Sequence, residues 1–181
     1  MAYPTDYSVA EHLNSRFLNL SLHTSWLSEE NEVVVFPLWN LSGQIVGVQQ
    51  YRPNASKEPN NKWYGRYFTR VHADNVAVWG LESWNLSNTL FVCEGLFDAA
   101  KVTWLGYSAV AVFSSSPGKS LLNWFRAVRT MRPVVALCDS DKVGLGLAKC
   151  AHKHFQLKEY HDVGDAPLSY VRDLCRQFNE D

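Results

Sequence analysis

Two apolar strand patterns that run directly into carboxylates constrain the fold of this chain more than any other feature of its sequence. The strand patterns cover residues 90–93 and 134–138. The carboxylates that follow them are Glu94, Asp98, Asp139 and Asp141. In open parallel α/β sheets, ligands bind at the edge where the strands end. Carboxylates gathered there repel one another, so we expect them to hold a hard cation such as Mg²⁺ (or Mn²⁺) beside a substrate phosphate.

From residue 88 onward the sequence alternates between strand and helix patterns. The predicted strands are 90–93, 108–113, 134–138 and, more weakly, 157–160, and the predicted helices are 95–105, 119–131, 143–155 and 167–178. Alternation with short connections predicts right-handed βαβ units and therefore an α/β fold, with a mainly parallel sheet flanked by helices. The acidic segments end the first and third strands, and two strand ends can meet across a crevice to form one site.

Residues 1–87 predict a small N-terminal α+β lobe. Ser8 and Glu11 have the spacing of a capping box for a helix over residues 8–18. The runs 33–39 and 44–51 flank a short turn with Gly and predict an antiparallel hairpin. A polar loop is expected next, followed by further short strands at 67–69 and 76–79. We therefore expect two domains, residues 1–87 and 88–181.

Composition limits the class of protein. With 181 residues and 46% hydrophobic content, the chain can bury the core of one domain with a small lobe. Its net charge of -1 gives no overall attraction to polyanions, so any nucleic-acid contact has to come from local Lys and Arg clusters. Four cysteines without CxxC spacing predict reduced thiols. Because no secretory signal or membrane-spanning run is visible, we expect a cytoplasmic protein.

The order of the acidic motifs resembles the TOPRIM domain shared by primases, topoisomerases and some nucleases. The residues that carry the resemblance are Glu94, Gly95, Asp98, Asp139, Ser140, Asp141 and Gly144. Both motifs follow strands in the right order, with a further strand between them. The preceding segments FPLWNLSGQIVGVQQYRP, RYFT and VWGLESW are similar to the segment before TOPRIM in bacterial and phage DNA primases. The resemblance covers most of residues 33–166.

This resemblance implies a TOPRIM-type core that transfers nucleotidyl groups on single-stranded DNA or RNA, using nucleoside triphosphates and Mg²⁺ (or Mn²⁺). The implied metal ligands are Glu94, Asp98, Asp139, Asp141, Asp162 and Asp165, of which Glu94, Asp139 and Asp141 are the catalytic candidates. The implied nucleic-acid contacts are Arg52, Lys62, Arg66 and Lys142. It also implies DNA replication in a bacterial or phage-infected cell, with a helicase or another protein acting in trans. The zinc module and helicase phosphate-binding loop that often accompany primase cores have no matching motif here.

Some of the acidic residues also fit structural roles. Asp98 can pair with Lys101 or hold the turn that follows the first strand. Asp162 and Asp165 can form a turn with a helix cap instead of a second metal site. Both interpretations stay open at the level of the sequence.

The basic and aromatic residues also allow two interpretations. Lys142 can neutralise the neighbouring acids or meet a phosphate. Trp63 and Tyr64 can stack on unpaired bases, but we expect them to be buried against the hairpin.

The sequence leaves three functions open. A primase-like nucleotidyltransferase is the first. A TOPRIM nuclease is the second, because the same carboxylates can support hydrolysis of a phosphodiester. A module that only binds nucleic acid or a protein partner is the third.

Overall fold

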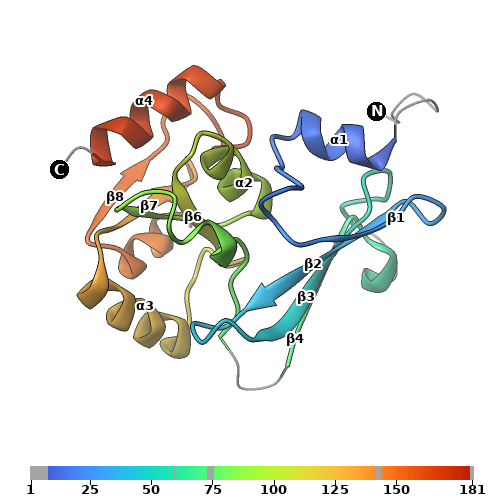
Figure 1. Cartoon of the computed structure of the whole chain (residues 1–181), viewed down its shortest axis with the longest axis horizontal. Helices are drawn as coiled ribbons and strands as arrows, with labels where there is room; N and C mark the ends of the chain where they lie inside the picture. Colours follow the sequence, from blue (N-terminus) through green and yellow to red (C-terminus); the bar gives the residue numbers. More distant parts are fainter. Residues whose placement is uncertain (1–7, 59, 73–75, 142–143, 180–181) are drawn as a thin grey trace.

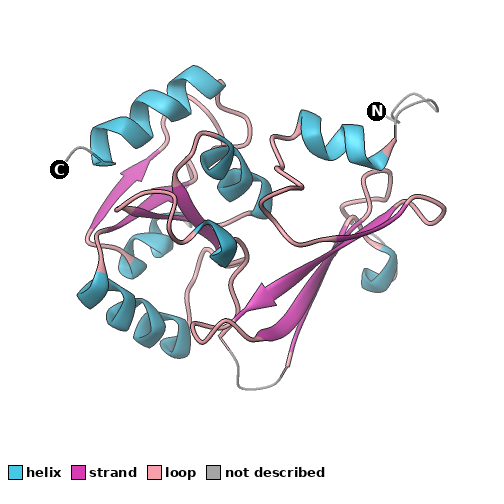
Figure 2. Cartoon of the chain, in the orientation of Figure 1, coloured by secondary structure: helices cyan, strands magenta, loops and turns pink. Residues whose placement is uncertain are grey.

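A computed structural model describes residues 8–58, 60–72, 76–141 and 144–179. It contains an antiparallel sheet of order β1-β2-β3-β4 and a parallel sheet of order β6-β5-β7-β8 (Figures 1 and 2). The N-terminal elements are α1 (Val9–Ser15), β1 (Trp26–Ser28), β2 (Val33–Trp39), β3 (Ile45–Tyr51), η1 (Lys62–Tyr64), β4 (Tyr67–Val71) and η2 (Leu81–Ser83). The C-terminal elements are β5 (Leu90–Cys93), α2 (Leu96–Trp104), β6 (Ser108–Ala111), α3 (Lys119–Met131), β7 (Val134–Cys138), η3 (Gly144–Cys150), β8 (Lys153–Gln156) and α4 (Leu168–Asn179).

The parallel sheet is buried on both faces, which explains why its central strands are apolar throughout. Alternate residues of β5 enter different cores because successive side chains point to opposite faces of a strand. Phe91 packs with residues of α2 and α4, and Val92 packs with residues of α3 and η3. The predicted fold class, a mainly parallel sheet flanked by helices with an N-terminal α+β lobe, is confirmed.

The N-terminal lobe follows the predicted pattern. Ser8 and Glu11 form the capping box that starts α1. The β2–β3 hairpin and β4 form where they are expected, whereas residues around 76–79 make only isolated bridges, Trp39 with Val78 and Trp79 with Ala111. These bridges connect the antiparallel sheet to β6.

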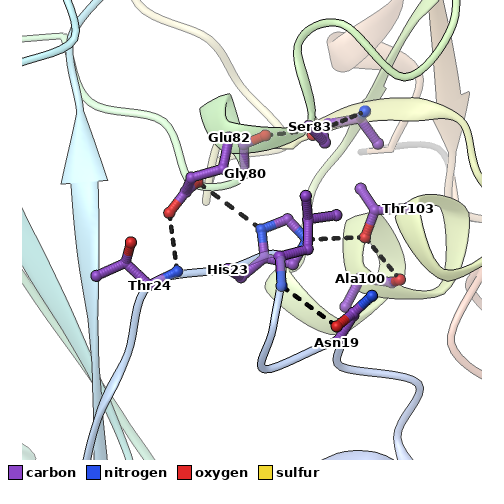
Figure 3. A network of polar contacts seen from close by, with 10 residues as sticks. Asn19, His23, Thr24, Gly80, Glu82, Ser83, Ala100 and Thr103 are labelled. Atoms are coloured by element: carbon purple, nitrogen blue, oxygen red, sulfur yellow. Dashed lines mark hydrogen bonds and ion pairs between the residues drawn. The ribbon is translucent and has the colours of Figure 1, made fainter.

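A buried polar network also joins the N-terminal segment to the parallel-sheet domain (Figure 3). The His23 Nε2 atom lies 2.9 Å from the Thr103 hydroxyl on α2, and its Nδ1 atom lies 3.7 Å from a Glu82 oxygen. Glu82 also accepts a hydrogen bond from the Thr24 N–H. The imidazole packs against Trp79, with the ring centroids 4.2 Å apart. One continuous core therefore includes residues of both sheets.

The predicted helix over 143–155 and strand over 157–160 are wrong. The chain instead forms the 3-10 helix η3, followed by β8, which pairs parallel to β7. Glycine lowers α-helix stability, and a Cβ at Gly146 would lie 2.2 Å from the Ser115 carbonyl oxygen. This close approach of two backbones requires glycine at position 146 and keeps the segment between β7 and β8 compact. Strand β8 therefore begins at Lys153, before the predicted start at residue 157. In the described part of the chain, every helix is too short or too polar to cross a membrane.

Candidate functional site

An open cavity of about 740 Å³ lies between the antiparallel sheet and the carboxyl ends of the parallel strands. Its acidic lining residues are Glu94, Asp98, Asp162 and Asp165. Its basic lining residues are Arg16, Lys57 and Arg66, which come from the N-terminal lobe. The cavity therefore brings carboxylates and cationic side chains together.

Asp98 connects two segments of the acidic lining. One of its carboxylate oxygens accepts the Gly95 N–H (3.1 Å) at the start of α2, and the other accepts the Gly164 N–H (2.7 Å). Burial, followed by Asp162 and Asp139, raises the pKa of Asp98 to about 7. Asp98 therefore stabilises the turn after β5, which is the structural role that the sequence left open for it.

Lys101, one turn after Asp98 on α2, holds the same acidic loop. Its buried ammonium group donates to the carbonyl oxygens of Gly164 and Ala166. Burial lowers the pKa of Lys101, and the neighbouring Asp98 opposes this shift. Helix α2 therefore fixes the loop that carries Asp162 and Asp165 through both a carboxylate and an ammonium group.

Glu94, Asp139 and Asp141 follow the central strands β5 and β7. Glu94 and Asp139 are half-buried and Asp141 is exposed. Burial and then Asp141 raise the pKa of Glu94. Burial, then Glu94, Asp162 and Asp141, raise the pKa of Asp139 to about 6, against the effect of His161. Asp139 and Asp141 lie beside the cavity rather than among its lining residues.

These carboxylates are chemically suited to a divalent cation. Burial, and after it the repulsion between neighbouring carboxylates, raises the pKa values of three of them, and Mg²⁺ prefers oxygen ligands of this kind. Among the described residues, no three His, Cys, Asp or Glu side chains converge closely enough to hold an ion as they stand. The oxygen donors fit Mg²⁺ in their chemistry, but binding would require the side chains to move closer together.

The predicted nucleic-acid residues are not all in one place. Arg66 lines the cavity and donates from Nε to the Ala55 carbonyl oxygen. Arg52 lies outside the cavity lining, and its Nη1 donates to the Gln50 side chain. Lys62 begins η1, but its side chain lies outside the described part of the structure, as does all of Lys142.

Sequence reasoning missed Arg16 and Lys57, and it named Lys101 only as a partner of Asp98. The Arg16 guanidinium stacks on Phe97, 4.4 Å from the ring centroid. Nothing in the sequence marks Arg16, because its position depends on how α1 packs on the other domain. Lys101 does leave a signal: with Asp98 it carries the only charges of an otherwise apolar helix.

Comparison with solved structures identifies the fold as that of TOPRIM-containing primase catalytic cores. The catalytic core of DnaG is 17% identical to this chain, with a TM-score of 0.63 over 94% of the chain and 70% of the core. The DnaG primase catalytic domain bound to ssDNA is 16% identical, with a TM-score of 0.63 over 98% of the chain and 72% of that domain. The primase fragment of the bacteriophage T7 primase-helicase protein is 14% identical, with a TM-score of 0.64 over 98% and 82%.

These comparisons detect the likeness through the structure. No family model and no curated protein matches the chain by sequence. The predicted resemblance to primase cores is confirmed for the fold.

Proposed function

We propose that this chain is a primase-like enzyme that transfers nucleotidyl groups on single-stranded nucleic acid with the help of Mg²⁺ (or Mn²⁺). The observation that carries the proposal is the cavity lined both by carboxylates and by Arg16, Lys57 and Arg66. A nucleoside triphosphate has the matching chemistry, since its phosphates need both cationic side chains and a divalent ion. Two neighbours of the same fold, a primase domain bound to ssDNA and a primase-helicase fragment, support this choice.

Glu94, Asp139 and Asp141 are the proposed ligands of a first ion, and Asp162 with Asp165 of a second. A bound ion would neutralise charge on the phosphates and on the phosphorus under attack. If Glu94 does not bind the ion directly, its raised pKa suits it instead to accept a proton from an attacking 3′ hydroxyl. Both oxygens of Asp98 accept backbone N–H bonds, so we assign Asp98 to positioning, although it belongs to the predicted ligand set.

The cations of the N-terminal lobe complete the proposed mechanism. Arg16, Lys57 and Arg66 would orient the triphosphate by charge and hydrogen bonding. We place the reaction in DNA replication in the cytoplasm of a bacterial or phage-infected cell, with a helicase or another protein as a partner in trans. A nuclease would use the same carboxylates to activate water, and the experiment below separates the two activities.

The test is incubation of the chain with single-stranded DNA, labelled ribonucleoside and deoxyribonucleoside triphosphates and Mg²⁺, followed by electrophoresis. We expect extension products, and we expect Asp139→Asn to reduce their formation by about two orders of magnitude or more, because it removes a charged group from an electrostatic site. Asp173→Asn, on an exposed position of α4, is the matched control and should retain activity. Cleaved template without synthesis would identify a nuclease, and neither reaction with any of these substrates would indicate a binding module.

A further inference from the structure

The antiparallel sheet has an outer face whose composition is unusual for a surface. Val34 and Tyr51 belong to its buried inner face, so their neighbours Val35 and Gln50 point the opposite way. The outward residues of β2 are also apolar, although one-sided antiparallel sheets normally alternate between apolar and polar residues. An apolar outward row is typical of a surface that binds something.

The strand register places this row across all four strands. Trp26 pairs with Val35, Val35 with Gln50, and Gln50 with Phe68. Trp63, from η1, lies over Phe68 with ring centroids 4.3 Å apart. Trp26 and Trp63 remain 50% and 49% exposed, and Tyr64 is 68% exposed. The predicted burial of Trp63 and Tyr64 against the hairpin is therefore wrong. Indole rings are therefore available at both ends of the row.

The charged side chains that the strand register and the hydrogen bonds place on this face are arginines. Arg70 lies on the same face as Phe68, two residues further along β4, and pairs with Val48. Arg52 lies on this face as well, because its guanidinium donates to the Gln50 side chain. The four strands contain no Asp or Glu. Two acids of the β1–β2 turn, at one end of the sheet, are held by other partners: Glu29 accepts the Val9 N–H, and Glu32 accepts from the Asn54 amide.

This face is continuous with the cavity. The Arg52 N–H donates to the Arg66 carbonyl oxygen (2.8 Å), so the two arginines are neighbours on adjacent segments. Arg66 lines the cavity, whereas Arg52 points to the outer face. Positive charge therefore extends from the cavity around the end of β3 and β4 to the aromatic row.

We propose that the outer face of the antiparallel sheet, the row Trp26–Val35–Gln50–Phe68 with Trp63, Arg52 and Arg70, binds single-stranded nucleic acid. Bases stack on the exposed indoles, and the arginines contact phosphates, which is the combination used by sequence-tolerant single-strand binders. The absence of acids from the strands favours a polyanion over a protein partner. The proposal rests on the proposed function, since it extends the path of the strand that enters the cavity.

The test is fluorescence anisotropy with labelled oligothymidine and oligouridine in EDTA, so that metal binding and catalysis do not contribute. Stacking contributes about 1–3 kcal/mol per base, so Trp26→Ala and Trp63→Ala should each weaken binding roughly 5- to 150-fold. Trp63→Phe should restore most of the affinity because it keeps an aromatic face. The matched control is Trp104→Ala, an exposed tryptophan (41%) on α2, which should bind like the wild type. Thermal unfolding by circular dichroism checks that each variant folds.

Salt dependence provides a second readout. Arg52→Ala and Arg70→Ala should each reduce the slope of log affinity against log salt by roughly 0.7, the contribution of one phosphate on a single strand. The difference in affinity between oligothymidine and oligouridine shows whether the chain prefers DNA or RNA.

Other outcomes would overturn the proposal and identify what is wrong. If Arg66→Ala weakens binding but the tryptophan variants do not, the strand lies in the cavity alone and the proposed function stands. If the wild type binds neither oligonucleotide but self-associates through Trp26 in sedimentation, the face is an interface between copies of the chain. If the wild type binds neither oligonucleotide yet still forms extension products in the Mg²⁺ assay, only the sheet-face proposal fails. If it neither binds an oligonucleotide nor forms extension products, the proposed function is rejected too.

Discussion

Asp98 offers the sharpest test of how the acidic site is built. Its buried carboxylate accepts backbone N–H bonds from Gly95 and Gly164. Burial, with Asp162 and Asp139, raises its pKa from 3.8 to about 7. We expect Asp98→Asn to remove this titration from the folded chain without abolishing folding.

The sign of the effect follows from proton binding. Between the pKa of Asp98 in the unfolded chain, 3.8, and its pKa in the folded chain, about 7, the folded chain holds a proton that the unfolded chain has released. Folding therefore takes up a proton in this pH range. Its contribution to stability is therefore fully present below about pH 4 and is lost as the pH rises through about 7. With 1.36 kcal/mol per pKa unit, the wild type should lose about 2 kcal/mol relative to the variant between about pH 5 and about pH 7.

Asn also changes the hydrogen bonds at every pH. It has one acceptor oxygen, so one of the two backbone N–H groups loses its partner at a cost of about 1–3 kcal/mol. The variant should therefore be less stable than the wild type at about pH 5, and the difference should narrow by about 2 kcal/mol towards about pH 7.

Urea denaturation in EDTA at several pH values measures this difference. Asp173→Asn, on the exposed side of α4, controls for the loss of a carboxylate and should parallel the wild type. A stability difference between the wild type and Asp98→Asn that stays constant with pH would refute the buried, proton-holding carboxylate described above.

Three further predictions concern the surroundings of the site. Lys101→Met should destabilise the chain by roughly 2–6 kcal/mol, because two buried carbonyl oxygens lose their donor at about 1–3 kcal/mol each, and hydrogen exchange of the Gly164 amide should accelerate. Gly95→Ala should lower the free energy of unfolding, measured by urea denaturation, by about 1–3 kcal/mol, because its Cβ would lie 2.5 Å from an Asp98 oxygen. The control is Gly118→Ala at the N-cap of α3, which should lower it less because the space around Gly118 is open. Burial raises the pKa of all four cysteines, so a thiol reagent should label none in the native chain and all four after unfolding; rapid native labelling would contradict their burial.

Local sequence patterns were enough to predict most of the elements and the position of the acids at strand ends. Apolar runs such as Leu90–Cys93 specify buried strands, and Ser8 with Glu11 specifies the start of α1, because these signals act within one or two turns of chain. The helix predicted over 143–155 failed because a contact distant in sequence decides that segment: Gly146 approaches the backbone of Ser115 too closely for a side chain.

Which charged residues share a site depends instead on contacts between segments that are distant in the sequence. Asp98 and Gly164 are far apart in sequence, and their hydrogen bond depends on the parallel pairing of β7 with β8 and on the packing of α2. Arg16 reaches the cavity because its guanidinium stacks on Phe97 of α2. Arg52 points to the outer face, where it donates to Gln50 of β3. The local sequence pattern specifies which residues form most strands and helices. Long-range packing specifies which side chains contact one another, and the chemistry of the site depends on these contacts.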